Sequence, residues 1–371
     1  MKKVLNVIIL MEPGGVQQRE RMFRPYLTSG GYDFKSVFLY KKIDDGLKDS
    51  IYLFHKKPNL FQFPIIFFKL VKIFLTYRPH VLIAWGWTAN SFSTIASLVT
   101  PKCKKIVMQS STAYEYKMVD GKYQRLIASI GTFADKFLGS IGLYDLNIMI
   151  SNHDQKSFSK YPKSYLKNCK LINNGVGLET PTDADIQFIN EKLSLIPKGK
   201  KLIGSVGRLT NIKNQSLIVN ALQYLPDVFY AIVGQGPFKD NLINDAIKFN
   251  VDDRLLLIGS LRPSEITAFL KRLDLFVFPS LSEAFGLAVV EAASVPLPIV
   301  TIDAPWVYDT LEDACIKSEN DPKRFAANIE KVLNNALLYN ELKEKSLNLA
   351  KKYAYSTMAN NYIKEIQRLL S

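Results

Sequence analysis

The sequence is poor in the residues that build disulfide frameworks and metal sites. Its 371 residues include three cysteines, Cys103, Cys169 and Cys315, and only three histidines. The cysteines are odd in number and lack the short spacings of a zinc site. A disulfide scaffold is therefore excluded, and a reducing compartment is favoured. No Asp-x-Asp pair follows a strand in the second half of the chain, so we predict no metal site there.

Long uninterrupted hydrophobic runs are also lacking. The run Val4–Met11 follows two lysines, as in a secretion signal, but Asn6 interrupts it and Glu12 ends it without a small-residue cleavage site. A first β-strand is the better interpretation. The second apolar stretch, Asn59–Tyr77, contains two lysines, which are costly inside a bilayer. We therefore expect no membrane span and a cytoplasmic protein, with peripheral attachment to the inner face of the cell membrane as an addition.

Acidic residues are scarce in the first half of the chain. Residues 1–180 hold 26 Lys and Arg against 12 Asp and Glu, whereas residues 181–371 hold 22 of each, so the net charge of +14 lies entirely in the first half. One interpretation is a generally basic proteome. The other is attraction to an anionic surface, either lipid headgroups or a phosphate-bearing acceptor. Charge alone also suggests nucleic-acid binding, but no run of five basic residues occurs, so we exclude that partner.

The stretch 51–78 has basic residues but no acidic one, together with an aromatic stripe. It predicts a helix that packs on the first sheet. The alternative is a helix that touches a membrane with its lysines snorkelling, and inserts a face formed by Phe67 and Phe74. On that alternative the N-terminal domain docks on anionic bilayers.

Short apolar runs alternate with longer amphipathic stretches, which is typical of βαβ units and parallel sheets. Two α/β domains are predicted: residues 1–177, completed by a returning C-terminal helix at 357–371, and residues 201–356. A turn signal at Asn174-Gly175 begins a poorly periodic stretch, so we place a linker region at 178–200. Strands are expected at 4–11, 34–39, 81–85, 105–108, 146–151, 201–206, 228–233, 254–258, 275–279 and 298–302.

Two segments of the second half carry chemistry. In the first, an apolar strand ends at Gly207, and Arg208 and Lys213 follow before the next helix. Glycine lets a bulky anion approach the backbone, and the two cations neutralise its charge from two sides.

The second segment runs from a buried strand into a loop that carries Glu283. A helix begins near Phe285, and the N–H groups of Phe285, Gly286 and Leu287 offer an anion or hydroxyl site. Glu291 lies within this otherwise apolar helix, either at an edge that faces solvent or aimed into a cleft. Carboxylates of this kind commonly bind the vicinal hydroxyls of sugars and riboses.

The ordered set of motifs resembles the retaining glycosyltransferases of family 4. Glu283 and Glu291 have the spacing of that family's Glu–seven residues–Glu motif. The resemblance covers essentially the whole chain and is strongest at 201–300. The other matching segments are Gly14-Gly15, Ser151, Asn174-Gly175-Val176, Gly207-Arg208 with Lys213, Val233–Pro237, Ile258-Gly259 and Tyr353–Met358.

The resemblance implies the GT-B fold, in which two Rossmann-like domains face each other and the C-terminal helix crosses back to the first. It also implies sugar transfer from a nucleotide-diphosphate donor, with UDP expected, to a glycan or polyprenyl-linked acceptor in bacterial surface polysaccharide synthesis, without a cofactor. Arg208, Lys213 and Glu283 would act at the reacting centre, and Gln109 and Ser110 would lie on the acceptor side. The donor would contact Gly15, Gly207, Gly259, Ser260, Leu261, Phe285, Gly286, Leu287 and Glu291.

The chain also departs from the family pattern. The frequent His at the end of the fourth strand is absent, where the sequence reads Met108-Gln109-Ser110, and Ala304-Pro305-Trp306 stands where a double glycine is frequent. A catalytically inactive sugar-nucleotide binding subunit is therefore one alternative. A GT-B epimerase or phosphorylase is another, because it uses the same diphosphate chemistry.

Overall fold

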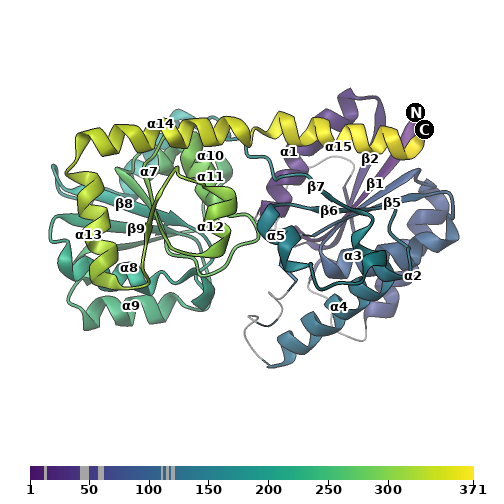
Figure 1. Ribbon diagram of the computed structural model, residues 1–371, viewed down its shortest axis with the longest axis horizontal. Helices are drawn as coiled ribbons and strands as arrows, with labels where there is room; N and C mark the ends of the chain where they lie inside the picture. The colour runs from purple at the N-terminus through teal and green to yellow at the C-terminus, as the bar shows by residue number, and fades with distance from the viewer. Residues whose placement is uncertain (12–14, 42–49, 57–61, 110–111, 114–116, 118–121) are drawn as a thin grey trace. The chain divides into compact units, whose positions relative to one another are not determined.

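The computed structural model describes residues 1–11, 15–41, 50–56, 62–109, 112–113, 117 and 122–371 (Figure 1). The chain forms two compact units. Unit 1 comprises Met1–Gly175 and Tyr355–Ser371, and unit 2 comprises Val176–Ala354. From the sequence, the first domain was expected to end at residue 177 and the second at residue 356, each two residues beyond the end of the corresponding segment in the structure.

The stretch predicted as a linker, 178–200, is instead part of unit 2. It contains helix α7 (Asp183–Lys192), which begins with a capping box between Thr182 and Asp185. Arg262 donates a hydrogen bond of 2.7 Å to Asp185, and Ile189 is buried. Helix α7 thus packs beside α10 (Pro263–Leu270). The sequence periodicity of α7 is weak, but its capping box and its buried Ile189 stabilise the helix.

Unit 1 is built on a seven-stranded sheet in which all neighbouring strands are parallel, in the order β3-β2-β1-β4-β5-β6-β7. The β4 run Val81–Trp85 is buried at every position, as expected for a parallel strand covered on both faces. The strands are β1 (Lys2–Met11), β2 (Tyr32–Lys41), β3 (Ser50–Tyr52), β4 (Val81–Trp85), β5 (Lys104–Met108), β6 (Leu146–Met149) and β7 (Cys169–Leu171).

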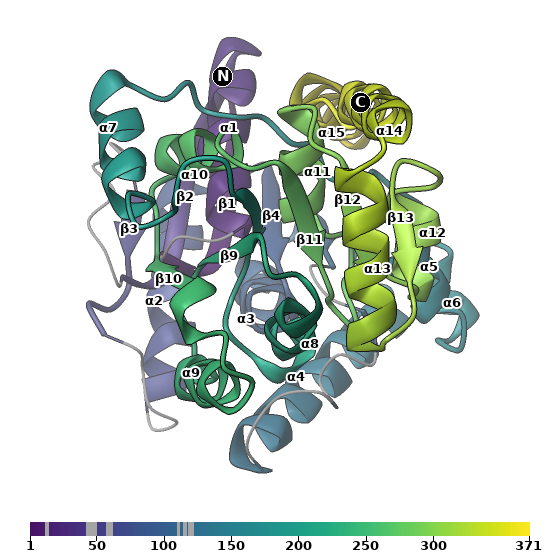
Figure 2. The ribbon, with the colours of Figure 1, turned by 90° about the vertical axis from the view of Figure 1, so that its left-hand side faces the viewer.

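Helices cover both faces of this sheet, and Figure 2 shows α1 and α15 on one side with α2, α3 and α4 on the other. The predicted return of the C-terminal helix is present: α15 packs on α1, and its Glu365 forms a salt bridge with Lys170. The helices are α1 (Gly15–Ser29), α2 (Phe63–Tyr77), α3 (Trp87–Ala96), α4 (Lys122–Ser140), α5 (Asn152–Ser157), α6 (Lys163–Leu166) and α15 (Tyr355–Leu370), and a 3-10 turn η2 (Ser97–Val99) follows α3.

Helix α2 corrects the expectation of an inserting aromatic face. Phe74 is fully buried in the core, and Phe67 is half-buried and packs against the same core. The helix thus packs on the first sheet through Phe74, and this residue is not part of an inserting face. Across the described parts of the chain, every helix is too short or too polar to cross a bilayer.

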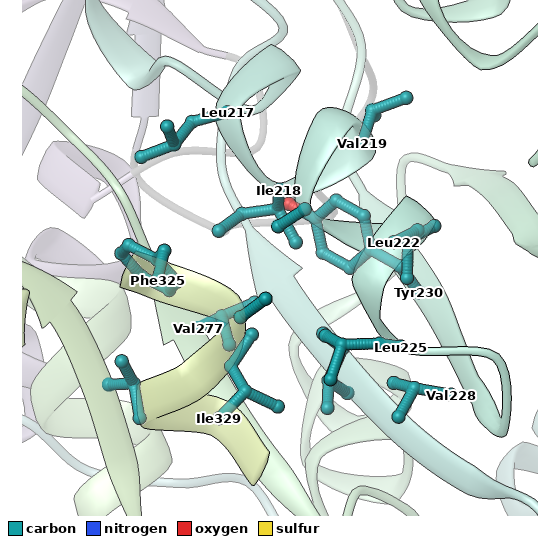
Figure 3. Packing of buried hydrophobic residues seen from close by; sticks show 14 of the residues in the cluster. Leu217, Ile218, Val219, Leu222, Leu225, Val228, Tyr230, Val277, Phe325 and Ile329 are labelled. Atoms are coloured by element: carbon teal, nitrogen blue, oxygen red, sulfur yellow. The ribbon is translucent and has the colours of Figure 1, made fainter. Parts of the chain in front are cut away.

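Unit 2 has a six-stranded parallel sheet in the order β10-β9-β8-β11-β12-β13. Side chains of α8 and α13, including Ile218 and Phe325, fill the core on one face (Figure 3). Helix α10 lies on the opposite side (Figure 2). The strands are β8 (Lys201–Val206), β9 (Val228–Val233), β10 (Leu255–Gly259), β11 (Leu275–Phe278), β12 (Ile299–Ile302) and β13 (Ile316–Ser318). The remaining helices are α8 (Ser216–Ala221), α9 (Lys239–Lys248), α11 (Leu287–Ser294), α12 (Pro305–Thr310), α13 (Pro322–Leu333) and α14 (Ala336–Lys352), with 3-10 turns η4 (Asn211–Lys213), η5 (Leu222–Tyr224) and η6 (Asp252–Arg254).

A buried carboxylate joins the strands and helices of unit 1. Asp135 of α4 accepts hydrogen bonds from Asn90 (3.1 Å), Gln109 (3.2 Å), Tyr144 (2.9 Å) and Tyr165 (2.9 Å). Burial raises the pKa of Asp135, and each of these donors lowers it. Because the donors come from α3, the end of β5, the start of β6 and α6, the network fixes α4 against the sheet.

We predict that Asp135→Asn destabilises the protein by about 1–3 kcal/mol, because its new NH2 group is directed at buried donors. Tyr165→Phe is the milder control, since it removes one hydroxyl and leaves the other three donors paired. Chemical denaturation measures both free energies of unfolding. Equal stability of the wild type and Asp135→Asn would show that the network adds nothing.

Candidate functional site

The strand order of unit 2 marks one end of its sheet as a ligand site. The chain passes from β8 to β9 on one side, and β11 later pairs with β8 on the other. In open parallel sheets, ligands bind beyond the carboxyl ends of the strands at such a reversal of strand order. The loops at this position follow β8, at residues 207–215, and β11, at residues 279–286. They are the two segments to which the sequence assigns chemistry.

Hydrogen bonds hold these two loops together. The N–H of Leu281 donates to the carbonyl oxygen of Ile212 at 2.9 Å, and the Ser280 hydroxyl donates to the same oxygen at 3.3 Å. The indole of Trp306 is fully buried and donates to the Ser280 carbonyl at 3.1 Å. The loops therefore form one supported surface.

The predicted cation and carboxylate meet on this surface. The ammonium group of Lys213 forms a salt bridge with Glu283, and both side chains are largely buried, with 16% and 13% of their surface exposed. The same ammonium lies 5.4 Å from the centroid of the Phe278 ring. Arg208 is exposed in the first loop. The site thus holds two cations and one carboxylate at the reversal of strand order.

Helix α11 begins two residues later than the sequence suggests. Its first residue is Leu287, and Gly286 is its N-cap residue in the left-handed conformation. Phe285 is therefore not helical, and its buried ring packs edge-on against Tyr353 at 5.0 Å. The N–H groups of Leu287 and Ala288 precede the first helical hydrogen bond, which Val289 donates to Gly286 at 3.1 Å.

Glu291 lies one turn into α11 and is 7% exposed. Of the two positions left open by the sequence, its burial excludes the solvent-facing one. A nearly buried carboxylate needs polar partners to offset the loss of its hydration. The position of Glu291 is therefore that of a side chain directed into the protein.

Close backbone packing shapes the first loop. Gly234 follows β9 with φ +147°, and a Cβ atom placed there would lie 1.9 Å from the carbonyl oxygen of Gly207. The N–H of Gly234 donates to the Gly259 carbonyl at 2.8 Å, and that of Gly207 to Val233 at 2.9 Å. The loops after β8, β9 and β10 are therefore interlocked, and only glycine fits at Gly234.

The third loop places the residues expected to border the base. Gly259 ends β10 with φ +87°, Ser260 is exposed, and the side chain of Leu261 is buried. Leu261 can therefore meet a ligand only through its backbone groups.

The residues assigned to the first half are less well placed. Gly15 is the first residue of α1, whereas its neighbour Gly14 and the acceptor-side Ser110 lie outside the described residues. Gln109 is fully buried, and its amide donates to Asp135, Asn147 and Tyr165. The side chain is thus part of the core network of unit 1, and its acceptor-side role stays a prediction.

The structure adds residues that motif reasoning missed. The Gln215 amide donates to the Arg208 carbonyl at 3.1 Å and so holds the cationic loop. Within the described residues, the Thr210 hydroxyl and the Gln215 side-chain oxygen are buried without a hydrogen-bond partner. Trp306 supports the second loop through its hydrogen bond to Ser280. In the sequence, this residue was noticeable only because Ala304-Pro305-Trp306 stands where the family frequently has a double glycine.

The cysteines are unsuited to nucleophilic chemistry. Burial raises the pKa of each of the three thiols to about 12, so the reactive thiolate is scarce near neutral pH. Charge stabilisation by Arg208 and Lys213 remains the chemistry that the described site residues offer.

Comparison with known protein families concerns mainly this half of the chain. Residues 187–349 match the family model "Glycosyl transferases group 1" and include both loops. The likeness to that family thus covers the larger part of unit 2. The matched stretch contains every site residue that the sequence assigns to the second half of the chain.

Curated relatives and solved structures extend the likeness. The O-antigen biosynthesis glycosyltransferase WclY of Escherichia coli is 28% identical over 224 residues, which is 58% of each chain. An Escherichia coli UDP-Gal:alpha-D-GlcNAc-diphosphoundecaprenol alpha-1,3-galactosyltransferase is 29% identical, over 60% of this chain and 58% of the relative. The alignments thus span 58% of the length of each relative. HepE of Anabaena, solved with UDP and glucose, has a TM-score of 0.81 at 16% identity, over 99% of this chain and 100% of HepE. The chain has the GT-B fold.

We predict that Gly286→Ala lowers stability by about 1–3 kcal/mol and weakens nucleotide binding, because the left-handed residue would gain a Cβ only 3.0 Å from the Trp306 ring. Gly199→Ala is the matched control: its φ is +89°, but nothing lies within 4 Å of the added Cβ. Thermal unfolding and nucleotide titration measure both effects. Indistinguishable behaviour of the two variants would contradict a role for Trp306 in shaping the loop.

Proposed function

We propose that the protein is a retaining glycosyltransferase that takes a hexose from a nucleotide-diphosphate donor, with UDP as the nucleotide. The observation that carries this proposal is the meeting of Lys213 and Glu283, beside Arg208, at the reversal of strand order in unit 2. In a sugar nucleotide the diphosphate and the sugar are directly bonded. A site for both therefore needs cations next to a hydroxyl-binding carboxylate.

In the proposed complex, Arg208 and Lys213 bind the diphosphate, and Glu283 accepts hydrogen bonds from the sugar hydroxyls. Glu291 binds the ribose hydroxyls, and the N–H groups at the start of α11 donate to donor oxygens. Backbone groups of Gly259, Ser260 and Leu261 border the base. Gly15 of the first domain stays a predicted donor contact.

In the proposed reaction, the bond between the sugar C1 and the diphosphate oxygen breaks, and a bond from C1 to the acceptor oxygen forms on the same face. The acceptor proton passes to an oxygen of the departing phosphate, so no protein nucleophile is needed. The released nucleoside diphosphate gains negative charge, which the two cations stabilise. Their charge substitutes for a divalent ion, so we propose a metal-independent reaction without a cofactor.

We further propose a glycan or a polyprenyl-linked sugar as the acceptor, in the synthesis of a bacterial surface polysaccharide. Support comes from the names of the relatives, one of which acts in O-antigen biosynthesis and another on a diphosphoundecaprenol-linked sugar. The basic first half of the chain suits an acceptor that carries phosphate.

A panel of nucleotide sugars tests the function. We expect the purified protein to release free nucleotide from one donor class, as followed by mass spectrometry, at the same rate in EDTA as with added manganese. Release that stops in EDTA and returns with manganese would contradict the metal-independent reaction. Binding of a donor without any turnover, with or without acceptor, would instead favour an inactive binding subunit.

Removal of either cation should slow transfer strongly while the fold is kept. We predict that Arg208→Ala and Lys213→Ala each lower kcat by about a hundredfold to a thousandfold, by analogy with the loss of an oxyanion-hole donor. The controls are Lys271→Ala and Arg272→Ala, because these exposed cations precede β11 at its opposite end. Near-normal turnover in both site variants would refute the diphosphate assignment.

A further inference from the structure

Helix α4 carries a row of large apolar side chains on its solvent side. The row consists of Leu126, Ile130, Phe133, Phe137 and Ile141, the last directly after the helix, and each is between 55% and 71% exposed. We call this row the α4 stripe. At about 100° per residue its members fall within roughly 80° of the helix circumference, over a length of about 23 Å.

The orientation of α4 is fixed from its other side. Asp135, Leu138 and Thr132 are buried, and the network around Asp135 ties the helix to the sheet of unit 1. In addition, Gly139 lies so close to Tyr165 that a Cβ there would approach the ring at 2.4 Å. The helix therefore cannot roll to bury the stripe, which stays in water as long as the unit stands alone.

The neighbouring elements extend the apolar surface. Helix α3 packs between α2 and α4 on the same side of the sheet (Figures 1 and 2). Of the 22 large hydrophobic residues exposed in the described chain, eleven lie in this layer, which makes it a concentrated patch rather than scattered surface. Besides the α4 stripe they are Ile65, Phe68, Leu75, Ile95, Leu98 and Val99.

Among the described residues of 62–141, the exposed charges around the patch are basic. Residues 62–141 contain ten Lys and Arg against three Asp and Glu. One of the three acidic residues, Asp135, is buried, whereas Lys72, Lys122 and Arg125 are exposed on α2 and α4. An apolar stripe bordered by cations suits a bilayer with acidic lipids, because its acyl chains are apolar and its headgroups are anionic.

We propose that the α4 stripe is a membrane-docking element that lies in the headgroup region of an anionic lipid bilayer, with the exposed side of α2 beside it. The apolar side chains enter the acyl boundary, and the flanking lysine and arginine side chains contact lipid phosphates. This surface belongs to unit 1, and none of its residues is among those assigned to the donor site. The proposal goes beyond the transferase function, because docking requires no turnover.

Vesicle binding by the full chain tests the proposal. We expect tighter binding to vesicles of phosphatidylcholine with phosphatidylglycerol than to phosphatidylcholine alone, and a part of this binding should survive high salt. The triple variant Ile130→Ser, Phe133→Ser, Phe137→Ser should reduce the partition coefficient by about tenfold or more and remove the salt-resistant part. Donor turnover without vesicles should stay unchanged, so failure of docking is distinguishable from failure of the proposed function.

The matched control is Leu195→Ser, Ile247→Ser, Leu337→Ser, which removes from unit 2 three apolar side chains that are each more than half exposed. It should bind vesicles within about twofold of the wild type, since it leaves the amphipathic surface intact. Wild-type binding by the α4 variant would overturn the proposal. So would a dimer in sedimentation analysis that the α4 variant abolishes, because a second copy would then cover the stripe.

A second measurement does not depend on the stability of the triple variant. In Phe133→Trp, the added indole should be quenched by brominated lipids on binding, whereas Leu337→Trp should give no quenching beyond the wild type. Absence of extra quenching at residue 133 with vesicle binding intact would place docking elsewhere and overturn the proposal.

Discussion

The candidate site depends on the hydrogen bonds that Ser280 and Leu281 donate to the carbonyl oxygen of Ile212. These bonds tie the loop after β11 to the loop after β8. Glu283 belongs to one loop and Lys213 to the other, so the salt bridge between them needs this attachment. The indole N–H of Trp306 donates to the carbonyl oxygen of Ser280 and so adds a second hydrogen-bonded support to the loop after β11. The charged groups are thus supported by backbone contacts that involve no charge.

This arrangement explains why the residues of the second half were predictable from the sequence. Strand ends, glycines and charged residues in a βα loop follow one another along the chain, and parallel pairing brings them to the same edge of the sheet. The strands at 201–206 and 228–233 have the predicted bounds. The second is a continuous apolar run, and the first is buried from Leu202 to Ser205. The partner of Lys213 was not predictable, since the spacing along the chain does not show which side chains meet across two loops.

Errors arose where tertiary contacts outweigh local pattern. The edge strands β3, β7 and β13 have three residues each, too few for a period to be visible, and exist because a neighbouring strand pairs with them. The family resemblance assigned Gln109 to the acceptor side. Its amide serves the buried Asp135, a partner 26 residues further along the chain.

Helices α2 and α4 of unit 1 show why composition does not fix orientation. In α2 the aromatic content suggested an exposed face at Phe67 and Phe74, but Phe74 shares its side of the helix with Ile66 and Leu70, and all three are buried. In α4 the direction follows from a single polar requirement. Asp135 must reach its four donors, and the helical period then sends Phe133 and Phe137 outward. A buried carboxylate and an exposed apolar stripe are therefore two consequences of one helix rotation.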